Sequence, residues 1–156
     1  MEIKAELKKP ITDGQRLDFI VEYNHKQGYE IRETEEEIQA WGYTEEELAL
    51  QEKERIAKLN LTGADVERGI YQAKGMDFDD ILAFVTVNPP QGLDVKALKI
   101  ELKANHFYRG NPYVNAVGGL LGFTSEQLDK FFEFNDYTYL LPIEEPEVEK
   151  PVEVEE

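Results

Sequence analysis

Residues 62–87 read TGADVERGIYQAKGMDFDDILAFVTV, and this stretch predicts two consecutive helices, over 63–74 and 78–87. In both segments small or apolar residues recur at the i, i+3, i+4 and i+7 spacing of one helix face. Thr62 and Asp77 stand immediately before the two segments, where a side-chain oxygen can accept a hydrogen bond from a free backbone amide. Two apolar helix faces so close in sequence need a common core, so the stretch predicts a helical bundle.

Similar helix starts recur along the chain. Thr44 precedes Glu47 at the spacing that lets the two side chains satisfy free amides reciprocally. Thr124 and Gln127 repeat that spacing, and Asn111 precedes a proline at a first helical position. The predicted helices cover 34–41, 45–59, 63–74, 78–87, 94–108, 112–121 and 125–134.

The first 33 residues predict strands instead. Apolar and polar residues alternate over 3–7, 17–23 and 29–33. The polar break after 17–23 contains Gly28, which can adopt a positive φ in a turn, so the second and third segments are expected to form a hairpin. A three-stranded antiparallel meander is plausible, and it must pack on another element because an isolated hairpin is only marginally stable.

We therefore expect an α+β fold that is mainly α. A small N-terminal antiparallel β-meander should be followed by a compact helical bundle and a disordered acidic tail. The tail reads PIEEPEVEKPVEVEE, and its seven glutamates and three prolines leave too little apolar surface to offset the entropy of ordering. The expected divisions are a β-hairpin or meander with a short helix over 1–43, a charged connector helix over 44–61, a helical bundle over 62–141 and the tail over 142–156.

The charge balance restricts the partners. Acidic residues number 33 and basic residues 17, which gives a net charge of −16. Nucleic acid is not an expected partner, because binding it requires a basic surface that displaces counterions. Lys96, Lys99 and Lys103 nevertheless fall on one face of the predicted helix 94–108, and Arg109 follows. These cations either pair with nearby glutamates or mark an acidic ligand or partner.

Residues that usually carry catalysis or bind metals are scarce. The chain has no cysteine and two histidines, which excludes thiolate chemistry and a three-histidine metal site within one chain. Ser125, the only serine, lies in a helix start without the G-x-S-x-G pattern. The aspartates at 77, 79 and 80 do not continue into a calcium-binding loop. We expect no enzyme activity, catalytic residue, metal or cofactor.

Aromatic residues crowd the C-terminal third, and most should lie in the core. Tyr137 and Tyr139 follow the last predicted helix. They either add a strand to the N-terminal sheet or present an apolar surface to another protein. The candidate partner-binding residues are thus Lys96, Lys99, Lys103, Arg109, Tyr137 and Tyr139.

Two features bear on location. No apolar run approaches the ~20 residues needed to span a bilayer, so a membrane is not an expected partner. The start MEIKAELKKP lacks the apolar stretch of a secretory signal. We expect a cytoplasmic protein of a host cell, or one associated with a virion.

The run GYEIRETEEEIQAWGYTEEELALQEKERIAKLNLTGADVERGIYQAKGMDF, with the later pieces YRGNP and GFTSEQLDKFF, resembles small uncharacterised proteins encoded among the tail genes of prophages in Gram-positive bacteria. The likeness covers about residues 27–134. It implies a short sheet-forming start, a charged helix and a compact helical part. It also implies a phage accessory or assembly context, and it transfers no catalytic residue. The longer N-terminus, the loop over 88–92 and the acidic tail depart from that pattern.

The function expected from these observations is that of a non-enzymatic accessory or assembly protein of the tail module. Its partners would be phage structural proteins or further copies of the chain. The alternative is an acidic inhibitor or nucleic-acid mimic that occupies a basic groove of a host protein. A hydrolase that uses paired carboxylates is a third hypothesis, and it requires a buried carboxyl group in a deep cleft.

Overall fold

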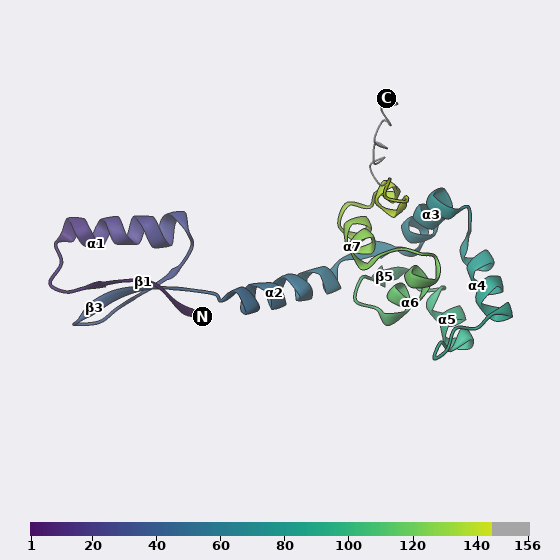
Figure 1. Ribbon diagram of the computed structural model, residues 1–156, viewed down its shortest axis with the longest axis horizontal. Helices are drawn as coiled ribbons and strands as arrows, with labels where there is room; N and C mark the ends of the chain where they lie inside the picture. The colour runs from purple at the N-terminus through teal and green to yellow at the C-terminus, as the bar shows by residue number, and fades with distance from the viewer. Residues whose placement is uncertain (145–156) are drawn as a thin grey trace, which may run out of the picture. The chain divides into compact units, whose positions relative to one another are not determined.

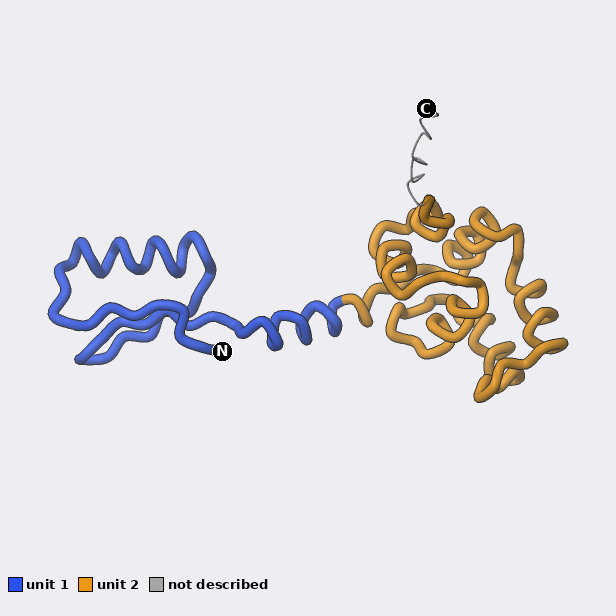
Figure 2. The backbone as a smooth tube through the Cα atoms, viewed as in Figure 1, with its two compact units in different colours: residues 1–55 blue, residues 56–156 orange. Residues whose placement is uncertain are grey.

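The computed structural model describes residues 1–144 and divides into two compact units, residues 1–55 and residues 56–156 (Figures 1 and 2). The predicted α+β fold that is mainly α, with an N-terminal antiparallel sheet, is confirmed. The predicted disordered tail lies, from residue 145 onward, outside the described residues.

Unit 1 is a three-stranded sheet with a helix on one side (Figure 1). The strand order is β1-β3-β2, and the central strand β3 pairs antiparallel with both neighbours. Buried Phe19, Ile38 and Ala40 form the core between the helix and the sheet. The elements are β1 (Glu2–Lys8), α1 (Asp13–Ile20), which continues into the π-helical turns η1 (Val21–Lys26), β2 (Glu30–Glu33) and β3 (Glu37–Gly42).

The strand predicted over 17–23 is wrong, because these residues belong to α1 and η1. Thr12 and Gln15 form a reciprocal cap that starts α1: the Gln15 amide donates to Thr12 Oγ1 (3.1 Å), and the Thr12 amide donates to Gln15 Oε1 (2.9 Å). Phe19 and Tyr23 are four residues apart and their ring centroids are 4.7 Å apart. The apolar residues therefore follow a helical period as well as an alternating one, and the cap favours the helix.

The helix predicted over 34–41 is also wrong, because residues 37–42 form β3. The Thr34 hydroxyl does accept from the amides of Glu36 and Glu37, both at 3.2 Å, as a helix cap would. However, the Thr34 amide also donates to the Glu37 carbonyl (2.8 Å), and this closes the turn between β2 and β3. The same threonine spacing thus serves a hairpin turn here.

Unit 2 is helical, with one small sheet. Helix α2 (Glu45–Lys58) spans the boundary between the units and has no buried residue. The helices predicted over 63–74, 78–87 and 125–134 are confirmed as α3, α4 and α7. The remaining bounds are β4 (Asn60–Thr62), α3 (Gly63–Lys74), α4 (Phe78–Val87), α5 (Val95–Glu101), β5 (His106–Tyr108), α6 (Pro112–Leu120), α7 (Ser125–Phe134) and the 3₁₀ helix η2 (Tyr137–Leu140).

The helix predicted over 94–108 is too long. It ends at Glu101, and residues 106–108 form β5, which pairs antiparallel with β4. Phe107 is buried opposite Leu61 in this pairing. The pairing places Phe107 in the core and breaks the helix that the apolar spacing predicts, so tertiary packing decides the conformation of this segment.

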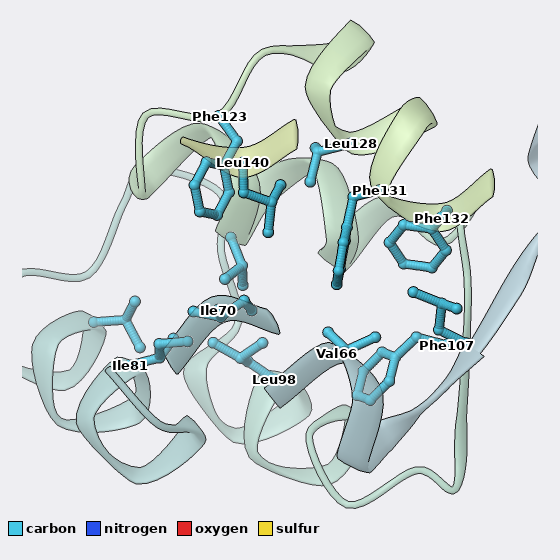
Figure 3. Packing of buried hydrophobic residues seen from close by; sticks show 13 residues of the cluster. Val66, Ile70, Ile81, Leu98, Phe107, Phe123, Leu128, Phe131, Phe132 and Leu140 are labelled. Carbon is cyan, nitrogen blue, oxygen red and sulfur yellow. The ribbon is translucent and has the colours of Figure 1, made fainter. Parts of the chain in front are cut away.

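The core of unit 2 gathers side chains from α3 to η2 around Phe131 (Figure 3). A Cβ atom added at Gly69 on α3 would lie 2.4 Å from Phe131 Cζ, so the phenyl ring packs directly on the helix backbone. A cavity of about 40 Å³ remains among these side chains, and its lining is almost entirely apolar. The space is smaller than a ligand and belongs to the core packing.

The start of α7 is joined to the end of the described chain. Gln127 Oε1 accepts from the Thr124 amide (2.9 Å), which completes the predicted reciprocal cap of the helix. The other end of the same side-chain amide donates from Nε2 to the Leu141 carbonyl (2.9 Å). One glutamine therefore fixes both the first turn of α7 and the segment that follows η2.

Candidate functional site

The two faces of the unit 1 sheet differ in what they present. On β3, Ile38 and Ala40 point toward α1 and are buried. The alternate residues Glu37, Gln39 and Trp41 lie on the opposite face and are half-buried. The outer face of the sheet therefore carries the only tryptophan of the chain.

The strand register places an apolar and a cationic residue beside this tryptophan. Ile3 on β1 lies opposite Trp41 and is 43% exposed. A bulge between Ile3 and Ala5 turns Ile3 to the outer face, although Ala5 packs inward. On β2, Arg32 lies opposite Gln39, diagonal to Trp41. We call Ile3, Arg32, Gln39 and Trp41 the tryptophan face.

Side-chain contacts hold this face in one arrangement. The Arg32 guanidinium carbon lies 4.3 Å from the centroid of the Trp41 ring, which is a cation–π contact. The Trp41 indole N–H donates to Gln39 Oε1 at 2.8 Å. Gln39 in turn donates to Glu37, and Arg32 Nε donates to Glu30 at 2.9 Å. The indole is therefore held in one orientation by its neighbours.

The carboxylates around the face are stabilised in the ionised form. A hydrogen bond from Lys8 is the main cause that lowers the pKa of Glu37, and a hydrogen bond from Arg32 lowers the pKa of Glu30. Lys8, Arg32 and Glu30 are exposed and Glu37 is half-buried at the surface, so each ion pair contributes little to stability. Their effect is to fix the positions of Lys8 and Arg32 at the edge of the face.

Tryptophan and arginine are the residue types that most often dominate the binding energy of protein interfaces. Side chains that are already ordered lose less conformational entropy on binding. The tryptophan face combines both properties with an exposed aliphatic neighbour, so its chemistry suits protein recognition.

The three predicted lysines lie at α5, and we call Lys96, Lys99 and Lys103 the lysine face. The first two are on α5, and Lys103 is in the turn that follows. All three are exposed, and none forms an ion pair with any residue from 1 to 144. Ion pairs between these three lysines and nearby glutamates, which were one of the two alternatives, are thus not formed within residues 1–144.

Arg109 does not extend the lysine face, because it is 5% exposed and bound internally. Its Nε donates to Asp129 (2.7 Å), and one terminal nitrogen donates to Asn115 (2.7 Å). The other terminal nitrogen donates to the Ser125 hydroxyl (2.9 Å) and carbonyl (3.2 Å). Arg109 therefore links α6 to α7, and its guanidinium is buried and bound internally rather than presented to a partner.

Tyr137 and Tyr139 lie in η2, so the alternative in which they add a strand to the sheet is wrong. The Tyr139 ring stacks on Phe134 of α7, with centroids 5.4 Å apart. Lys130 Nζ lies 5.8 Å from the centroid of the Tyr139 ring. Phe134 remains largely exposed and Tyr139 partly so, which leaves a small aromatic surface at this end of unit 2.

The tryptophan face was not predicted from the sequence. The signal was present, since residues 37–42 alternate between polar or aromatic and small or aliphatic side chains. A helix over 34–41 does not place alternate residues on opposite faces, so that prediction conceals the alternation. If Thr34 caps a helix, Trp41 has no sheet face to lie on. If Thr34 closes a hairpin turn, Trp41 lies on the outer face of β3.

Residues 1–144 contain no group of three or more histidine, aspartate or glutamate side chains that could hold a metal ion. None of their helices has the length and apolar character required to cross a membrane. Comparisons of the chain with protein-family models, curated proteins and solved structures give no match.

Proposed function

We propose that the chain is a non-enzymatic accessory or assembly protein of phage origin, acting in the tail module through protein–protein contacts. The observation that carries the proposal is the tryptophan face on the open side of the unit 1 sheet. The likeness to prophage proteins supplies the phage context. The partners would be structural proteins encoded nearby or further copies of the chain.

The energetics favour a macromolecular partner for this face. Covering the exposed parts of Trp41 and Ile3 would remove apolar surface from water, which contributes about 25 cal/mol per Å². Arg32 and Gln39 already orient the indole, so little of this gain is lost to ordering. The surrounding charged side chains form a polar rim, as interfaces usually have.

The division into two units supports a role in assembly. Each unit has its own hydrophobic core, and α2, which spans their boundary, buries no side chain. Unit 1 can thus bind one protein through the tryptophan face while unit 2 presents separate surfaces at α5 and η2.

Size-exclusion chromatography with light scattering, on the full chain alone and with the products of neighbouring genes, tests the proposal. Binding at the tryptophan face should shift the Trp41 emission to shorter wavelength, because the indole leaves water. The double variant Ile3→Ser with Arg32→Ala should bind at least about tenfold more weakly, as expected when central contacts are truncated. Leu17→Ser is the matched control, since Leu17 is an exposed aliphatic residue on α1.

A chain that stays monomeric and captures none of these products would count heavily against the proposal. Capture that the double variant leaves unchanged would place the contact outside the tryptophan face. Circular dichroism of each variant confirms that the sheet and helices are retained.

A further inference from the structure

The lysine face gathers three unpaired lysines on one short segment; Lys53, Lys58, Lys74 and Lys130 also form no ion pair within residues 1–144, but they are spread over other elements. About two acidic residues are present for each basic one. The cations in ion pairs are Lys4, Lys8, Lys9, Arg16, Lys26, Arg32, Arg55, Arg68 and Arg109. Lys96, Lys99 and Lys103 have no such partner among residues 1–144.

An apolar side chain lies among these three lysines. Ile100 follows Lys96 by four residues on α5, so helical spacing places it beside Lys96, and the Lys103 amide donates to the Ile100 carbonyl (3.1 Å) in the turn that follows. Its side chain is 71% exposed. The surface therefore offers three positive charges around an uncovered aliphatic group, and its complement is a segment that mixes carboxylates with aliphatic side chains.

The chain contains such a segment. Residues 145–156 read EPEVEKPVEVEE, with six glutamates and one lysine, a net charge of −5. Valines at 148, 152 and 154 are interspersed with the glutamates. We propose that the lysine face of one copy binds residues 145–156 of a second copy.

The placement of the elements in unit 2 favours a contact between copies. The segment follows η2, and η2 lies on the opposite side of unit 2 from α5 (Figure 1). A contact within one chain would have to pass around the unit, whereas a contact between copies needs no such path. Each copy contributes a different surface to the contact, so two copies can make it reciprocally or it can extend from copy to copy.

The test uses full-length variants in sedimentation velocity at about 0.1 M salt, where long-range repulsion between acidic chains is screened. The first variant replaces Lys96, Lys99 and Lys103 with glutamate. The second replaces Glu147, Glu149, Glu153 and Glu155 with glutamine. The matched control makes the same charge change away from α5, by replacing Lys26, Lys53 and Lys58 with glutamate.

We expect the wild-type chain to gain mass as its concentration rises toward the millimolar range, because a few exposed ion pairs give only weak association. Each variant alone should associate at least about tenfold more weakly. An equimolar mixture should form a one-to-one complex, since one variant retains the acidic segment and the other retains the lysines. The control should behave like the wild type.

Three results would overturn the proposal. One is a wild-type mass that does not change with concentration, and another is a mixture no heavier than its components. The third is a control that weakens association as much as the α5 variant does, because net charge alone would then be responsible. None of these measurements depends on the tryptophan face, so the two proposals fail separately.

Discussion

Replacing Gly69 with alanine tests the packing at the centre of unit 2. An alanine in a helix interior is more stable than glycine by about 1 kcal/mol, so the change should stabilise α3 if nothing opposes it. The new Cβ, however, would lie 2.4 Å from Phe131 Cζ and 2.6 Å from Cε2. The optimal separation of two non-bonded carbon atoms is about 3.5–4.0 Å, so the Phe131 ring must move by about 1 Å.

The cost follows from how firmly that ring is held. Phe131 is 2% exposed and belongs to the central cluster. Overpacking such a site costs about 1–3 kcal/mol, and the adjoining cavity of about 40 Å³ relieves part of it. After the gain of about 1 kcal/mol in helix propensity, we expect Gly69→Ala to lower the free energy of unfolding of unit 2 by up to about 2 kcal/mol.

Gly119→Ala is the matched control, since a Cβ at this helical position meets no atom within 4 Å. It should raise the stability of unit 2 by about 0.5 kcal/mol. Urea denaturation followed by circular dichroism measures both variants, and Trp41 fluorescence follows unit 1 as an internal reference. If Gly69→Ala is as stable as Gly119→Ala, Phe131 does not pack against α3 as described.

Three further changes test other parts of the structure. Arg109→Met should lower the stability of unit 2 by about 2–3 kcal/mol in urea denaturation, because Asp129, which is 32% exposed, loses its cationic partner. An unchanged denaturation midpoint would contradict the link that Arg109 makes between α6 and α7. Thr124→Ala should cost about 1 kcal/mol in the same assay, and an unchanged stability would show that the α7 cap is dispensable. Hydrogen bonds from Lys9 and Arg16 lower the pKa of Glu33, so the stability they add to unit 1 should be present at neutral pH and lost as the pH falls below ~4. Trp41 fluorescence in urea measures this loss, and Glu33→Gln should flatten the pH profile; an equally steep profile would mean that other carboxylates are responsible.

Much of unit 2 follows from local sequence signals. Where a cap residue precedes a strong apolar period, as at Thr62, Asp77 and Thr124, the helix is found with its predicted bounds. These signals are local, because a capping side chain and a helix face involve residues a few positions apart. The predicted end of the helix over 94–108 is wrong, because residues 106–108 pair with β4 although their apolar spacing is helical.

Unit 1 shows why local signals are insufficient. The spacing of Thr34 and Glu37 fits a helix cap and a hairpin turn equally, and only pairing with β1 and β2 distinguishes them. The alternation over 17–23 likewise fits a strand until α1 is seen to pack on the sheet. The tryptophan face depends on register and on a bulge, and neither can be read from one strand alone.

The side chain of Gln127 also determines how mechanical load would enter unit 2. A protein that held residues 145–156 would pull on the backbone after η2, which is bound to α7 by the hydrogen bond from Gln127 to the Leu141 carbonyl. Tension would pass from there into the first turn of α7, where Ser125 is held by Arg109. The helix that carries Phe131 is therefore the point at which the tethered end is anchored to the interior.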